Sequence, residues 1–106
     1  MNDEFQKLFE RVIALWSDNL PTSGKTLHGN GGASIPILTS VHDEISKKIE
    51  SISDNQLLIQ MDWAIYTILH QAARVHDRIE PRKVDMEAVR NIFNRNLALD
   101  EKNSEE

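Results

Sequence analysis

The stretch SDNQLLIQMDWAIYTILHQAARVHDRI, residues 53–79, decides the fold. At about 100° per residue, most of its apolar side chains fall within one broad arc, which is the pattern of a helix that packs against a core. The arc comprises Leu57, Leu58, Met61, Ala64, Ile65, Ile68, Leu69, Ala72, Val75 and Ile79. A second stripe lies on roughly the opposite side and comprises Ile59, Trp63, Tyr66, His70 and Ala73. A helix with two apolar sides is expected in the middle of a domain.

Both ends of this helix carry sequence signals. Ser53 followed by Gln56 is the pattern of a capping box, in which two side chains satisfy backbone donors of the first turn. Pro81 disfavours helical dihedrals at Glu80 and predicts the end of the helix just before it. The predicted helix has about 26 residues and is therefore about 39 Å long. This length makes it the longest element expected in the chain.

Three further helices are predicted around it. The first follows Asn2 and ends before Pro21, the second runs from about Ser34 to Ile52, and the fourth runs from about Met86 to Leu97 with Asp85 as its N-cap. No segment shows the alternation of a strand. The sequence therefore predicts an all-α domain, a four-helix bundle-like fold with one long central helix.

The chain is expected to form a single helical domain over residues 1–99. Residues 21–34, PTSGKTLHGNGGAS, are rich in glycine and lack periodicity, so they predict a flexible loop whose role stays open. Residues 100–106, DEKNSEE, are polar and mostly acidic, and they predict a disordered tail.

Composition excludes several classes of chemistry. The 106 residues include no cysteine, so disulfides, thiolate zinc sites and cysteine nucleophiles are impossible. A net charge of −5 argues against bulk attraction to nucleic acid or to anionic lipid. The N-terminal residues do not resemble a secretory signal, and no apolar run reaches the roughly 18 residues of a membrane span. We therefore expect a cytoplasmic protein without membrane contact.

Motifs that suggest catalysis lack their usual context. Ser23-Gly24-Lys25-Thr26 ends like a phosphate-binding loop, but it follows a helix where such a loop follows a strand. Two similar strings, residues 41–45 (VHDEI) and 75–79 (VHDRI), place His next to Asp, as in the metal sites of some hydrolases. Adjacent helical residues point about 100° apart, so these strings fit helix edges better. We expect no enzyme activity, no cofactor and no metal.

Asp62 is the polar residue that stands out on the central helix. It falls within an apolar arc, and a buried carboxylate must be paired or hydrogen-bonded. Tyr66, or a serine or histidine of a neighbouring helix, is the expected partner.

The last third of the chain is comparatively basic and offers a second surface. Arg90, Asn94 and Arg95 are expected on the outer face of the fourth helix. Arginine and asparagine suit both base edges of DNA and acidic groups of a protein partner.

The leading hypothesis is a non-enzymatic protein that acts by binding another protein, as a regulator, antagonist or inhibitor, and forms a homodimer through the second stripe of the central helix. Its size, acidity and helical build are comparable to those of small bacterial antagonists such as immunity proteins and antiactivators. The first rival is a DNA-binding regulator that uses the fourth helix in a helix-turn-helix. The second rival is a metal-dependent hydrolase built from the two His-Asp strings.

Overall fold

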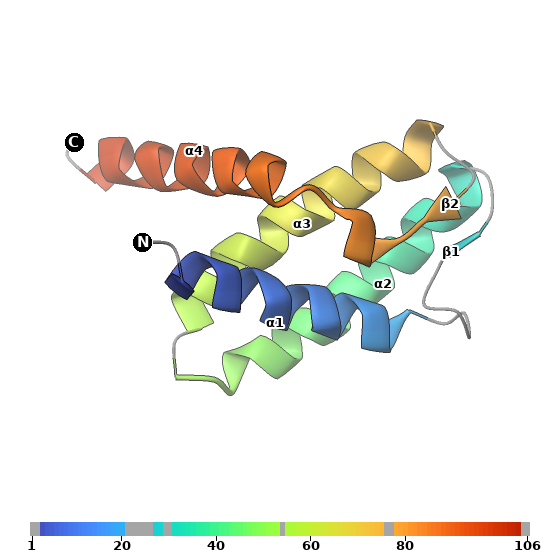
Figure 1. The fold of residues 1–106 in the computed structure, drawn as a ribbon, viewed down its shortest axis with the longest axis horizontal. Helices are drawn as coiled ribbons and strands as arrows, with labels where there is room; N and C mark the ends of the chain where they lie inside the picture. Colours follow the sequence, from blue (N-terminus) through green and yellow to red (C-terminus); the bar gives the residue numbers. More distant parts are fainter. Residues whose placement is uncertain (1–2, 21–26, 29–30, 54, 76–77, 105–106) are drawn as a thin grey trace.

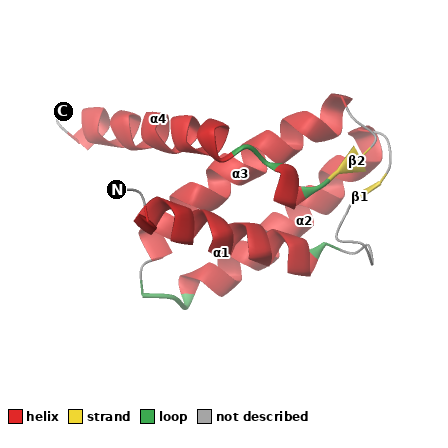
Figure 2. Ribbon diagram, viewed as in Figure 1, coloured by secondary structure: helices red, strands yellow, loops and turns green. Residues whose placement is uncertain are grey.

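The described part of the chain folds into four α-helices, an all-α helical bundle (Figures 1 and 2). The computed structural model describes residues 3–20, 27–28, 31–53, 55–75 and 78–104, with side chains described over 4–20, 35–53, 55–75 and 80–95. The helices are α1 (Asp3–Asn19), α2 (Gly31–Glu50), α3 (Asn55–Val75) and α4 (Met86–Ser104). Two short strands, β1 (Leu27–His28) and β2 (Arg78–Ile79), and a 3-10 helix, η1 (Pro81–Lys83), complete the described elements.

Helix α3 packs against the other three helices. It lies antiparallel beside α2, and α1 and α4 also pack on it (Figure 1). Figure 1 shows that α1 begins and α4 ends at the same end of the molecule. A central position for α3 alone is not confirmed, because α1 also touches all three other helices, α4 among them through Phe5 and Phe93.

The ends of α3 differ from the prediction. The helix starts at Asn55 and ends at Val75, so its 21 residues barely exceed the 20 of α2, and a single long helix is not found. Residues 78–79 instead pair antiparallel with 27–28, and this pairing supplies the backbone hydrogen bonds that a longer helix would have made. Glu80 is extended ahead of Pro81, as expected before a proline.

Two predicted irregular segments are partly regular. Helix α2 begins at Gly31 and β1 covers residues 27–28, so the predicted loop 21–34 is wrong for these residues; residues 21–26 and 29–30 lie outside the described part. Helix α2 contains Pro36 after its first turn. The proline lacks an N–H and so removes the backbone hydrogen bond to the carbonyl of Gly32, but a loss this close to the start of the helix is tolerated.

Helix α4 continues past its predicted end at Leu97 to Ser104, through strong helix formers such as Leu99, Glu101 and Lys102. The disordered tail predicted for 100–106 is therefore wrong up to residue 104, and 105–106 lie outside the described residues. The predicted cap is confirmed, because Asp85 Oδ1 accepts a 3.0 Å hydrogen bond from the backbone N–H of Glu87.

One apolar core joins the four helices. Its buried members are Leu8, Val12, Ile13, Trp16, Leu20, Leu38, Val41, Ile45, Ile49, Leu58, Met61, Ala64, Ile65, Leu69, Ala73, Val89 and Phe93. Leu57 and Val75, which we expected in the core arc of α3, are exposed at its two ends. Among the described residues, no helix joins enough consecutive apolar residues to cross a lipid bilayer.

The core predicts a sharp contrast between two neighbouring leucines of α3. Leu58 is fully buried and Leu57 is exposed. We expect Leu58→Ala to lower the free energy of unfolding by about 2–5 kcal/mol, because it removes buried methyl groups and leaves a cavity. Leu57→Ala is the matched control and is expected to change it by less than about 1 kcal/mol. Urea denaturation measures both, and equal losses would contradict the assigned burial.

Candidate functional site

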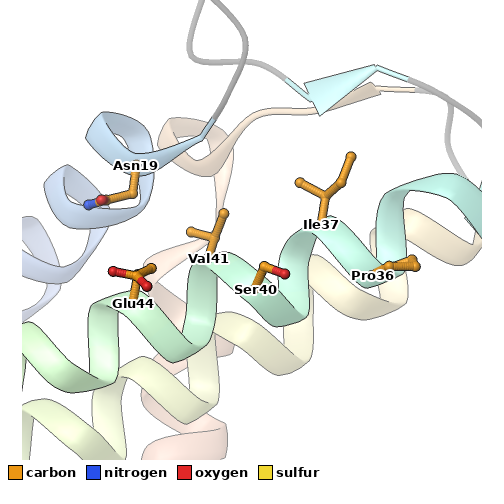
Figure 3. A pocket seen from close by; sticks show the side chains of 6 residues that line it. All are labelled: Asn19, Pro36, Ile37, Ser40, Val41 and Glu44. Carbon is orange, nitrogen blue, oxygen red and sulfur yellow. The ribbon is translucent and has the colours of Figure 1, made fainter.

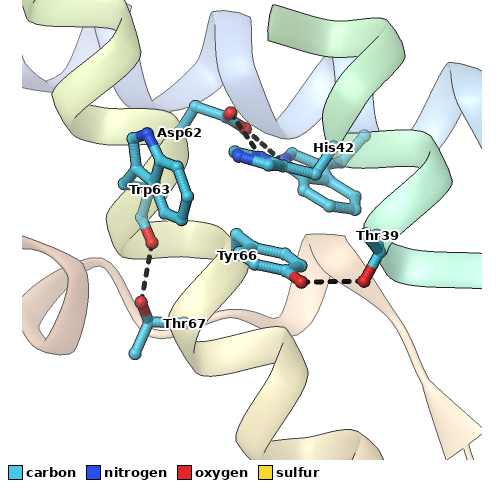
Figure 4. A network of polar contacts seen from close by, with 7 residues as sticks. Thr39, His42, Asp62, Trp63, Tyr66 and Thr67 are labelled. Carbon is cyan, nitrogen blue, oxygen red and sulfur yellow. Dashed lines mark hydrogen bonds and ion pairs between the residues drawn. The ribbon is translucent and has the colours of Figure 1, made fainter. Parts of the chain in front are cut away.

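A buried carboxylate ties three helices together at the centre of the bundle. Asp62 on α3 is 1% exposed. Trp16 on α1 donates its indole N–H to Asp62 Oδ1 at 2.8 Å, and His42 Nδ1 on α2 lies 2.7 Å from Asp62 Oδ2 (Figure 4). The predicted burial of Asp62 and its predicted histidine partner are found. The indole partner was not foreseen from the sequence.

The contact between His42 and Asp62 is short but not aligned as a hydrogen bond. His42 Nδ1 and Asp62 Oδ2 therefore have no hydrogen-bond partner among the described residues, although they face each other at 2.7 Å. One of the two atoms must carry a proton, since an unprotonated imidazole nitrogen and a carboxylate oxygen are both acceptors and would repel at this distance. Both atoms lie in the interior, where a polar group without a partner is costly.

Aromatic rings enclose the imidazole of His42. It stacks on the ring of Tyr66 at 4.4 Å between centroids with an interplanar angle of 11°, and it meets Trp63 edge-on, also at 4.4 Å. Trp16 lies beyond, at 6.3 Å from the imidazole. Stacked and edge-to-face contacts are the favoured geometries for such ring pairs, so Tyr66 and Trp63 fix the position of the imidazole. The polar network thus continues through aromatic rings toward the surface.

Tyr66 links the aromatic rings to α2 through a hydrogen bond. Its hydroxyl lies 2.9 Å from Thr39 Oγ1, and Thr39 in turn donates to the carbonyl of Ile35 at 3.1 Å (Figure 4). Since the single hydroxyl proton of Thr39 is used in that bond, Tyr66 is the donor to Thr39. Tyr66 as a hydrogen-bond partner of Asp62, one of our expectations, is therefore wrong; its hydroxyl binds α2.

The outer side of these rings forms a surface that we call the Trp63 face, consisting of Ile59, Trp63, Tyr66 and His70. The side chain of Trp63 is 49% exposed, and the other three residues are half-buried. A shallow depression of about 310 Å³ lies on this face, and its lining residues are Trp63, Tyr66, Thr67, His70, Gln71 and Arg74. The structure thus gathers four of the five predicted interface residues on one surface of α3.

Ala73, the fifth predicted interface residue, is a correction. It is fully buried in the core. At 100° per residue it points closer to Leu69 and Asp62 than to Trp63, so the packing of α3 against its neighbours covers it. The second apolar stripe is therefore shorter than the sequence suggested.

The basic residues of α4 do not reach the Trp63 face. The guanidinium of Arg90 lies 4.8 Å above the ring of Phe5 on α1, and Phe5 also meets Phe93 edge to face at 5.7 Å. Asn94 and Arg95 are exposed. The connection from α3 to α4 contains β2 and η1, so it differs from the short turn of a helix-turn-helix. Arg90 is therefore already engaged within the protein.

Only the first of the two His-Asp strings lies wholly within the described residues. His42 is buried and paired with Asp62, whereas its neighbour Asp43 is exposed. Residues 76–77 of the second string lie outside the described residues, as does the string at 23–26. In the part of the chain that the structure describes, no group of three His, Asp or Glu side chains is placed to hold a metal ion.

A second depression, of about 400 Å³, lies between the end of α1 and the outer side of α2 (Figure 3). Its described lining consists of Asn19, Pro36, Ile37, Ser40, Val41 and Glu44. The amide of Asn19 already donates to the carbonyl of Leu15 at 2.8 Å. The lining is mainly apolar, and it presents no arrangement of groups suited to a reaction.

The comparisons with known proteins add no relative. No protein-family model, no curated protein and no solved structure matches this chain.

The buried network leads to a prediction about Asp62. Asp62→Ala removes the acceptor of the Trp16 indole and the carboxylate that faces His42, and we expect it to lower the free energy of unfolding by about 3–5 kcal/mol, because two buried polar groups lose their partner. The exposed Asp43→Ala, next to His42 in the sequence, is the matched control and is expected to change it by less than about 0.5 kcal/mol. Urea denaturation measures the difference. A loss below about 1 kcal/mol for Asp62→Ala would contradict the network.

Proposed function

We propose that this protein acts without catalysis, by binding another protein, and that it is a homodimer formed through the Trp63 face. The observation that carries the proposal is the half-exposed indole of Trp63, fixed above a buried polar network. The expectations of a regulatory or inhibitory role and of a cytoplasmic location belong to the same proposal.

The distribution of exposed apolar side chains supports a binding role for α3. The large hydrophobic residues that are exposed in the described part of the chain are Leu57, Trp63 and Val75, and all three lie on α3. Tryptophan and tyrosine are enriched among the residues that dominate binding energy at protein interfaces. A helix that packs against the other three thus also carries the exposed groups most suited to a partner.

The support beneath Trp63 favours binding as well. The indole of Trp63 contacts the rings of His42, at 4.4 Å between centroids, and of Tyr66, at 5.8 Å. A side chain held in this way loses little conformational freedom when a partner covers it, so more of its burial contributes to affinity.

The proposed surface is smaller than the two-sided helix expected from the sequence. Ala73 is buried, and Leu57 and Val75 lie toward another side of α3, about 120° from Trp63. An aromatic centre with a polar surround is typical of interfaces between separately folded proteins. We therefore propose association of folded protomers.

Static light scattering on the purified protein tests the proposal. We expect a dimer for the wild type and a monomer for Trp63→Arg, because the substitution places a charge where the indole would be buried. Val75→Arg is the matched control, since Val75 is 74% exposed on another side of the same helix, and it is expected to leave the dimer intact. A monomeric wild type at high micromolar concentration would contradict self-association.

A further inference from the structure

The Trp63 face continues onto α2, and its two ends carry opposite charges. Thr39 and His42 of α2 touch Tyr66 and Trp63, so α2 borders the face along its length. At one end lies the exposed guanidinium of Arg74, in the last turn of α3. At the other end Glu50 is exposed, and its carbonyl oxygen lies 3.5 Å from Asn55 Nδ2 at the start of α3.

The residues of the face are arranged symmetrically along α3. Ile59, Trp63, Tyr66 and His70 follow one another at spacings of four, three and four. Reversing the direction of the helix about a point between Trp63 and Tyr66 exchanges Trp63 with Tyr66 and Ile59 with His70. A two-fold contact pairs residue i of one copy with j of the other and j with i, so an antiparallel pair of these helices would match Trp63 with Tyr66 and Ile59 with His70.

The charged ends obey the same symmetry. At 1.5 Å per residue, Arg74 and Asn55 each lie about 14 Å from the midpoint between Trp63 and Tyr66, in opposite directions, and Asn55 lies beside Glu50. An antiparallel second copy therefore brings each Arg74 level with Asn55 of the other copy, whose neighbour Glu50 is exposed.

We propose that the Trp63 face binds a second copy of this chain with the two α3 helices antiparallel, about a two-fold axis between Trp63 and Tyr66, and with Arg74 of each copy paired to Glu50 of the other. This inference rests on the proposed function and adds the orientation and the charge pair. Trp63 of one copy then packs on Tyr66 of the other and enters the depression of about 310 Å³.

Charge selects the antiparallel orientation over the parallel one. A parallel two-fold pair would place Arg74 against Arg74 and Glu50 against Glu50, and like charges across an interface are unfavourable. The antiparallel pair replaces both repulsions with two attractions. The guanidinium also suits a carboxylate geometrically, since it can donate two parallel hydrogen bonds.

The available area fits a small but specific dimer. Helix α3 is about 30 Å long, and two neighbouring helices present a face roughly 20 Å wide, so the surface is on the order of 600 Å². This approaches the roughly 800 Å² that a standard interface buries on each partner. The flanking polar residues Gln56, Thr67 and Gln71 are exposed and provide the rim.

Charge reversal tests the inference by sedimentation equilibrium. Arg74→Glu and Glu50→Arg are each expected to weaken the dimer by more than about tenfold in Kd, and the double variant is expected to return within about threefold of the wild type, since it restores the pair in reverse. Lys48→Glu, an exposed reversal on α2 with the same net charge as Arg74→Glu, is expected to leave Kd unchanged. Circular dichroism confirms that each variant is folded.

The outcomes separate the two proposals. Suppose that Trp63→Arg dissociates the wild-type dimer but that the double variant dimerises as weakly as the single variants. This result overturns the antiparallel charge pair and leaves the Trp63 face as the site of dimerisation. Unchanged dimerisation in both single variants also overturns the charge pair. A wild type that is monomeric overturns self-association and this geometry together.

Discussion

The buried carboxylate of Asp62 is the constraint on which the packing of three helices depends. It has almost no exposed surface, so its charge must be balanced within the protein, and it is contacted by an indole from α1 and an imidazole from α2. Removing one partner of a buried pair strongly destabilises the fold. Replacing both partners by apolar groups of the same size changes the stability much less. Such a pair contributes little net stability but disfavours any packing in which Trp16 or His42 fails to reach Asp62.

This constraint also shapes the surface. His42 is fixed by Asp62, and the rings of Tyr66 and Trp63 rest on His42 at 4.4 Å. The hydroxyl of Tyr66 is in turn bound to Thr39, so the ring is held at both ends. The exposed indole is therefore the outermost member of an ordered stack that begins in the core. The position of the exposed Trp63 indole thus depends on the buried contact between His42 and Asp62.

The sequence predicts the helices and their inner faces well, because apolar periodicity reports directly on burial. The cap at Asp85 and the burial of Asp62 were also predictable, since each depends on the local chemistry of one residue. The indole partner Trp16 was not, because 46 residues separate it from Asp62 and periodicity assigns tryptophan to the core without saying where its N–H points. The true end of α3 depends on pairing between residues 27–28 and 78–79, which no local pattern reveals.

The ladder between β1 and β2 has a further consequence for how the molecule opens. Its two paired residues on each side join the segment before α2 to the segment after α3, so the α2–α3 hairpin is closed at both ends while α1 and α4 lie outside the closure. Cooperative subunits of a fold often coincide with such closed motifs. We therefore expect the α2–α3 hairpin to unfold as one cooperative unit, and α1 and α4 to detach from it first. The backbone amides of the hairpin are then the slowest to exchange with solvent deuterium.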